Sequence, residues 1–185
     1  MIFNNHSGLN GMHAFLSASK YHWDRYSEET LIETFRNARS AARGSELHNY
    51  ANDAIRLGIK QRQTKQTLNM YVNDAIGYRM SPEQVLFYSA NAFGTADAIS
   101  FNKGLLRIHD LKTGVSPASM RQLEIYAALF CLEYAERPGE IDMELRIYQN
   151  DDVAVHVPET ERIAELMSRI ISFDKIIENL KREEG

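Results

Sequence analysis

The stretch GTADAISFNKGLLRIHDLK, residues 94–112, decides the fold because it joins two strand-forming segments through a tight turn. Residues 93–101 and 105–112 contain β-branched, aromatic and aliphatic side chains that favour extended backbone. Asn102-Lys103-Gly104 between them supplies turn chemistry, since glycine adopts a positive φ without steric cost. The sequence therefore predicts a β-hairpin with Lys103-Gly104 as a two-residue turn; the alternative, a three-residue turn with a bulge, would shift the register by one residue.

This hairpin would bring three charged side chains together. A two-residue turn places Asp97 directly opposite Asp110, with Cβ atoms about 5 Å apart, and like charges at that distance repel. Lys112 follows Asp110 by two residues and therefore points to the same face. A divalent cation between the acids would offset their repulsion. The competing interpretation is an ordinary ion pair between Asp110 and Lys112, with Asp97 as a strand-end residue, because structural ion pairs are common.

Composition narrows the class of protein. The chain has 185 residues, enough for one domain with a substantial core. Its net charge of −4 gives no overall basic field, so nucleic-acid binding would need a local patch. The lone Cys131 excludes an internal disulfide and a cysteine-ligated cluster. No apolar run reaches membrane-spanning length and no signal-peptide pattern opens the chain, so we expect a cytoplasmic protein without membrane contact.

Hydrophobic periodicity predicts helices before and after the hairpin. Gly44 is expected to break the first helical region into two helices. An arginine face that ends at Arg43 precedes it, and this face is either solvated or able to bind phosphate. The expected helices are 27–43, 45–58, 67–76, 117–136 and 159–181, and the expected strands are 85–90, 93–101, 105–112, 144–149 and 153–157.

The order of these segments predicts an α/β protein of the α+β kind, in one domain that spans residues 1–185. Residues 1–14 are polar and are expected to be flexible. A helical part at 15–80 precedes the sheet and central helix at 83–157, and a C-terminal helix follows at 159–182.

Four short motifs follow one another along the expected elements. Gly94-Thr95-Ala96-Asp97 and Asp110-Leu111-Lys112-Thr113-Gly114 lie on the hairpin, Gln122-Leu123-Glu124-Ile125-Tyr126 lies on the next helix, and Gly44-Ser45-Glu46-Leu47-His48 lies upstream. Each motif alone is a weak signal, whereas four in this order are more specific. Together they resemble the PD-(D/E)XK nuclease superfamily, and more closely its RecB-like and phage-exonuclease branch. The second acid motif here is Asp-x-Lys rather than Glu-x-Lys.

The resemblance implies a restriction-endonuclease-like core, an αβββαβ mixed sheet flanked by helices. It also implies a metal-dependent DNA nuclease, of the phage exonuclease type that acts in recombination or repair. DNA would be the partner, alongside a recombination or annealing protein or further copies of the chain. Two alternatives stay open: a catalytically silent nuclease-fold module that binds nucleic acid or protein, and a restriction-type endonuclease.

The resemblance also implies roles for individual residues. Phosphodiester hydrolysis needs an activated water and neutralisation of charge on the phosphate, and hard oxygen ligands suit Mg²⁺ or Mn²⁺. The lysine would orient the water or stabilise developing charge. The implied residues are Asp97, Asp110 and Lys112 for catalysis, His48, Asp97, Asp110 and the carbonyl of Leu111 for the metal, and Gln122, Tyr126 and Arg43 for DNA binding or support of the site.

Overall fold

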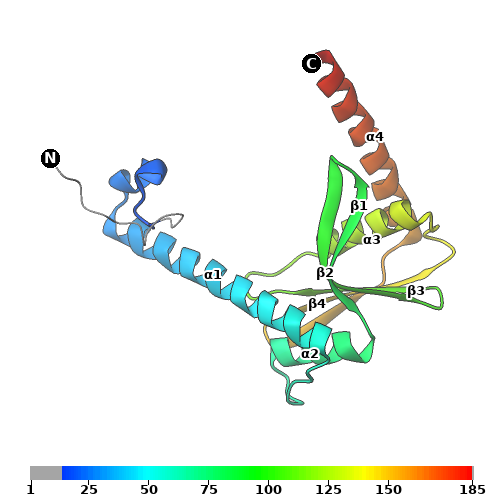
Figure 1. Cartoon of the computed structure of the whole chain (residues 1–185), viewed down its shortest axis with the longest axis horizontal. Coiled ribbons are helices and arrows are strands. Elements are labelled where there is room, and N and C mark those ends of the chain that lie inside the picture. The colour runs from blue at the N-terminus through cyan, green and yellow to red at the C-terminus, as the bar shows by residue number, and fades with distance from the viewer. Residues whose placement is uncertain (1–13, 185) are drawn as a thin grey trace. The chain divides into compact units, whose positions relative to one another are not determined.

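A computed structural model describes residues 14–184, and they form an α+β protein built on a five-stranded mixed sheet flanked by helices (Figure 1). The tertiary contacts divide the chain into two units, residues 1–43 and 44–185, which are described separately below. The expectation of a flexible segment at 1–14 falls almost entirely outside the described residues. The expectation of a single domain stays a prediction.

The first unit contains a short 3₁₀ helix, η2 (Ala18–Arg25), and the first part of the long helix α1 (Glu28–Leu57). The side chain of Ser27 accepts a hydrogen bond of 3.2 Å from the backbone N–H of Thr30, which is the typical way a serine caps a helix start. The predicted start of a helix at this serine is confirmed.

Gly44 does not break α1, so the expectation of two helices there is wrong. The helix runs without interruption from Glu28 to Leu57. Gly44 is buried, and a Cβ atom at this position would lie 2.7 Å from Oγ1 of Thr113. The residue is glycine because another part of the chain approaches the helix closely here, and the flanking helical residues hold the backbone in register.

The second unit contains the sheet, whose strands lie side by side in chain order. The first three form an antiparallel meander, the third and fourth are parallel, and the last two form another hairpin. A helix connects the two parallel strands, as a parallel pair requires. The strands are β1 (Ser81–Ser89), β2 (Ala92–Asn102), β3 (Leu105–Leu111), β4 (Asp142–Gln149) and β5 (Asp152–His156), and the further helices are α2 (Thr67–Gly77), α3 (Arg121–Tyr134) and α4 (Thr160–Glu184).

Most predicted segments are present with shifted ends. The largest shifts are in β1, which begins at Ser81, and in α3, which begins at Arg121 rather than near Pro117. Pro117 lies in the loop between β3 and α3. Proline is common in the first turn of a helix but also in loops, so Pro117 alone does not determine where α3 begins.

The turn between β2 and β3 has the predicted length and register. Asn102 pairs with Leu105 and Ala98 pairs with His109, so Lys103 and Gly104 alone form the turn. Both have positive φ angles, 51° and 77°, as a type I′ turn requires. Lysine at such an angle is strained because its Cβ crowds the backbone.

Lys103→Asn is therefore expected to raise the free energy of unfolding by about 0.5–1 kcal/mol, since asparagine tolerates the left-handed region. Urea unfolding measures the change. Lys65→Asn in an exposed loop, where no positive φ occurs, is the matched control and should change stability by less than about 0.5 kcal/mol. Equal effects of the two substitutions would contradict this account of the turn.

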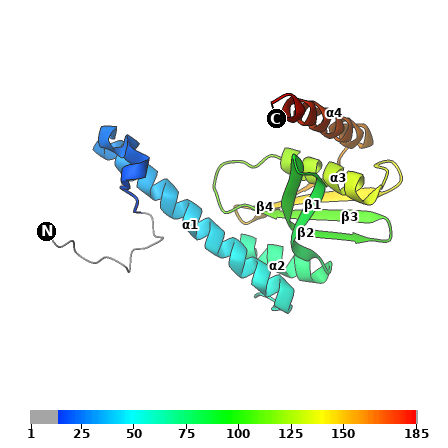
Figure 2. The ribbon, with the colours of Figure 1, turned by 45° about the horizontal axis from the view of Figure 1, so that its top comes forward.

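The sheet is covered on both faces. Helices α3 and α4 pack on one face, while α2 and the second part of α1 pack on the other (Figure 2). The first core includes Leu106, Ile108 and Leu123, and the second includes Tyr71, Leu111 and Tyr148. No helix among the described residues is long and apolar enough to cross a membrane.

Cys131 lies on α3 and belongs to the first of these two cores. It is 1% exposed, and burial raises the pKa of its thiol to about 11. We therefore expect a thiol-reactive dye at neutral pH to label the native protein at least about 100-fold more slowly than the urea-unfolded protein, because the reaction needs an opening of the core. Labelling at similar rates in both states would contradict the burial of this residue.

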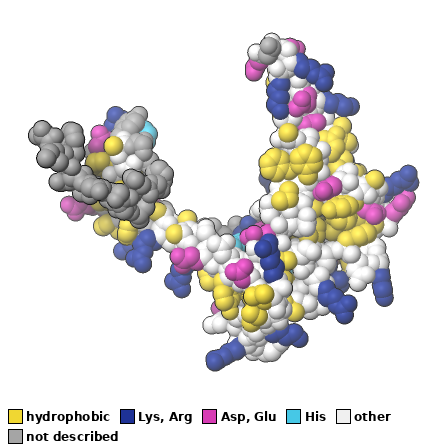
Figure 3. Space-filling model, in the orientation of Figure 1, with side chains coloured by type: hydrophobic (Ala, Val, Ile, Leu, Met, Phe, Trp, Pro, Cys, Tyr) yellow, Lys and Arg dark blue, Asp and Glu magenta, His cyan; other side chains and the backbone are white. Residues whose placement is uncertain are grey.

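Helix α4 packs through its first half only. Ile163 and Leu166 are buried against α3, whereas Phe173 and Leu180 are about half exposed. Hydrophobic side chains are accordingly visible at the surface over α4 and the hairpin of β1 and β2 (Figure 3). Polar contacts hold the second half of the helix to the hairpin tip, with Asp174 accepting hydrogen bonds from Ser89 and Asn91.

Candidate metal centre

The two acids predicted to face each other lie next to the last pair of the β2–β3 ladder. Ala98 pairs with His109, and the following positions are Asp97 and Asp110. Oδ2 of Asp97 accepts a hydrogen bond of 2.9 Å from the backbone N–H of Leu111. A side-chain carboxylate thus serves as the acceptor where a backbone carbonyl would continue the ladder, and it draws the two strand ends together.

Asp110 is a buried acid in an environment of excess negative charge. It is only 3% exposed, and its pKa is raised, first by burial and then by the negative charge of Asp97. Lys112 and His48 act in the opposite direction but do not cancel these effects. The repulsion expected from the sequence is therefore present, and a positive charge close to both acids would relieve it.

Lys112 supplies part of that positive charge. Its Nζ lies 3.0 Å from both carboxylate oxygens of Asp110 and donates a hydrogen bond to Oδ1. Apart from the ammonium of Lys112 at 3.0 Å, the buried Oδ2 of Asp110 has no hydrogen-bond partner among the described residues. A buried carboxylate oxygen is costly to leave without hydrogen bonds, so a cation bound here would stabilise it further.

Helix α3 fixes the position of the lysine. Oε1 of Gln122 accepts a hydrogen bond of 2.9 Å from Lys112 Nζ, and Nε2 of Gln122 donates one of 3.0 Å to the hydroxyl of Tyr126. The tyrosine ring in turn packs against Gly94, where a Cβ atom would lie 2.9 Å from Cε1 of the ring. The motif glycine is therefore needed for close approach, and a chain of contacts runs from β2 through α3 to Asp110.

His48 joins the group from α1. Its Nδ1 lies 3.4 Å from Oδ2 of Asp97, and both side chains are partly exposed. The close approach of Gly44 to Thr113, which belongs to the Asp-x-Lys motif, holds this part of the helix near the strand end. The structure thus brings residues of all four sequence motifs together.

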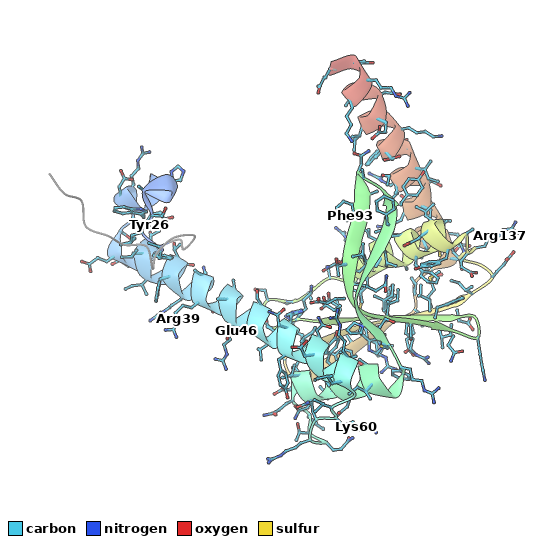
Figure 4. All side chains as sticks on the ribbon, in the orientation of Figure 1. Tyr26, Arg39, Glu46, Lys60, Phe93 and Arg137 are labelled. Carbon is cyan, nitrogen blue, oxygen red and sulfur yellow. The ribbon has the colours of Figure 1, made fainter. Side chains whose placement is uncertain are left out.

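Two further residues were expected at the site, Leu111 and Arg43. Leu111 is buried and contacts Asp97 through its backbone N–H, whereas a role for its carbonyl as a ligand stays a prediction. Arg43 is exposed and is the last residue of the first unit, so its role in DNA binding also stays a prediction. Glu46, labelled in Figure 4, is an exposed residue of α1.

The sequence did not indicate Tyr71, which lies near the acids. This residue of α2 is 2% exposed, and burial, Asp97 and Asp110, in that order, raise the pKa of its hydroxyl. In the sequence it belongs to the apolar stripe of an amphipathic helix, where a tyrosine is indistinguishable from any other core residue. Only the placement of α2 against the hairpin reveals its proximity to the carboxylates.

A buried polar network braces the strands behind the acids. The hydroxyl of Tyr148 donates a hydrogen bond of 2.7 Å to Asp74 and lies 3.2 Å from Nδ1 of His109. Arg146 donates to the same carboxylate at 3.2 Å. Burial, with Arg146 and Arg107, lowers the pKa of His109 to about 3, so the imidazole is neutral near pH 7. These contacts connect α2 to β3 and β4. Because His109 directly precedes Asp110, they also stabilise the position of Asp110.

The donor atoms fit a hard divalent cation. Asp97 and Asp110 offer carboxylate oxygens, including the buried Oδ2 of Asp110 that accepts no hydrogen bond, and His48 adds a ring nitrogen. Within residues 14–184, no three His, Cys, Asp or Glu side chains are already arranged around one ion position. Mg²⁺ commonly uses one or two carboxylates and keeps several waters, so the two acids suffice for it.

Comparisons with known proteins found no match for this chain among protein-family models, curated proteins or solved structures.

Proposed function

We propose that this protein is a metal-dependent deoxyribonuclease of the PD-(D/E)XK type, acting as a phage-type exonuclease in DNA recombination or repair. The observation that carries the proposal is the buried carboxylate of Asp110, which lies beside Asp97 and pairs with the ammonium of Lys112. The element order α2-β1-β2-β3-α3-β4 is the αβββαβ order of a restriction-endonuclease-like core, which supports the same assignment.

Each residue of the site has a defined task in hydrolysis. A bound Mg²⁺ or Mn²⁺ would supply an activated water and neutralise phosphate charge. Asp97 and Asp110 would hold this ion, with His48 and the Leu111 carbonyl as further ligands. Lys112 pairs with a carboxylate and would stabilise charge that develops on the phosphate. Gln122 accepts a hydrogen bond from the lysine and so fixes where its ammonium points.

The test uses the purified chain with Mn²⁺ and three DNA substrates: linear duplex, single strands and closed circles. We expect hydrolysis of a linear substrate that stops on addition of EDTA. Closed circles should stay intact, because an exonuclease needs an end, and nicking of the circles would favour the restriction-type alternative. Failure to degrade any substrate with either Mg²⁺ or Mn²⁺ would overturn the nuclease assignment.

One observation favours the alternative of a silent binding module. The ammonium of Lys112 already pairs with Asp110, as it would in a purely structural ion pair. Calorimetric titration with Mn²⁺ separates the two functions, because a binding module has no need of metal uptake that depends on the carboxylates. Uptake by the native chain and its loss in Asp97→Asn would exclude the silent module.

A further inference from the structure

A cavity of about 240 Å³ lies beside the candidate metal centre, and Lys112 forms part of its lining. Three leucines from different elements line it as well: Leu47 of α1, Leu68 of α2 and Leu111 of β3. The volume lies below the roughly 300–1,000 Å³ of pockets that hold drug-sized ligands, so the cavity suits a smaller group with both apolar and polar parts.

A fixed polar turn also borders this cavity. Asn150 and Asp151 line it and connect β4 to β5, with φ angles of 52° and 58°. Oδ1 of Asp151 accepts hydrogen bonds from the backbone N–H of Thr67 at 2.8 Å and from its hydroxyl at 3.1 Å, and the Asp151 N–H donates to the same hydroxyl at 2.7 Å. Three hydrogen bonds to the start of α2 therefore hold this border in one conformation before any ligand arrives.

The charges around the cavity determine which part of a nucleotide can enter it. The carboxylate of Asp151 repels a phosphate, whereas the ammonium of Lys112 attracts one. The leucine walls favour an apolar planar group, and the amide of Asn150 can form hydrogen bonds with the edge of such a group. A phosphate near Lys112 with its own base between the leucines satisfies all of these conditions.

We propose that this cavity binds one unstacked nucleobase of the DNA strand being cut, next to the phosphate held at the metal centre. The inference rests on the proposed nuclease function. It also restricts the substrate, because a base that enters the cavity cannot remain paired and stacked in a duplex. Single-stranded DNA, or an end whose final base pair has opened, is therefore the substrate class of this site.

The first experiment measures nucleotide binding by calorimetry with dAMP and with 2-deoxyribose 5-phosphate, which has the same phosphate and no base. In the presence of Mg²⁺, the wild-type chain should bind dAMP at least about 10-fold more tightly, which corresponds to about 1.4 kcal/mol. Leu68→Trp fills the cavity from α2 and should remove this preference. Leu57→Trp, at a position 72% exposed on α1, is the matched control and should keep it.

Leu47→Trp fills the cavity from α1 instead of α2. It replaces Leu68→Trp in this experiment if circular dichroism shows that Leu68→Trp does not fold. The proposal is overturned if dAMP and the sugar phosphate bind equally to the wild type, or if both tryptophan variants keep the preference. These readouts need no cleavage of DNA. If cleavage depends on Asp110 but the base preference is absent, the nuclease assignment stands and this inference alone fails.

Discussion

Asp110→Asn is expected to lower Mn²⁺-dependent hydrolysis of DNA by about 10³-fold, the upper end of what the loss of one key electrostatic group costs. The substitution keeps the size of the side chain but removes a charge that would bind the cation, at a position that is only 3% exposed. The initial rate of release of labelled nucleotides from a linear DNA measures the effect.

Asp53→Asn is the matched control, because it removes an exposed acid from α1 and should leave the rate unchanged. Binding of the cation gives a second readout. At a Mn²⁺ concentration about 100 times its dissociation constant, the native chain should gain about 2.7 kcal/mol of stability, or roughly 5–10 °C in melting temperature. Asp110→Asn should show little of this gain, and a variant that keeps both the rate and the thermal shift would refute the metal centre.

The second large effect is expected for Lys112→Met, which should slow hydrolysis by about 10²–10³-fold and also destabilise the fold. The substitution leaves Asp110 buried without its cationic partner, and breaking a buried pair in this way costs about 3–5 kcal/mol. Because the lysine side chain is 31% exposed and water reaches it, we expect about 2–3 kcal/mol in urea unfolding of the metal-free protein.

A double variant separates catalysis from stability. Asp110→Asn combined with Lys112→Met removes both charges of the pair, so most of the lost stability should return, while hydrolysis stays absent. Lys65→Met in an exposed loop controls for loss of a surface charge. If Lys112→Met unfolds at the same urea concentration as the native chain, the pair with Asp110 is not the stabilising contact described above.

The sequence allowed the register of the central hairpin to be predicted, because a two-residue turn leaves only one pairing. Lys103 and Gly104 both adopt positive φ angles, and the pairing of Asn102 with Leu105 follows from that local geometry. The contacts of Lys112 with Asp110 follow in turn, since residues two apart on a strand share a face. Short-range rules therefore account for much of the candidate site.

Contacts between distant parts of the chain were beyond such rules. Gly44 was interpreted from helix propensity alone, which contains no information on the approach of Thr113. The close contact between Gly94 and Tyr126 also joins distant parts of the chain, so the sequence around either residue does not indicate the other. The cavity beside Lys112 combines residues from two helices, a strand and a turn, so only the packed structure shows it.

The parallel pairing of β3 with β4 has a consequence for the order of folding. The β2–β3 hairpin forms from residues that are close in sequence. The pairing of β3 with β4, which begins at Leu105 and Asp142, joins residues separated by the whole of α3. Closing the loop between β3 and β4 costs conformational entropy, and only the contacts formed after closure offset that cost. The backbone N–H of Lys112 donates a hydrogen bond to the carbonyl of Tyr148 on β4, so a refolding chain should regain most of its circular dichroism signal before the proposed metal centre is assembled.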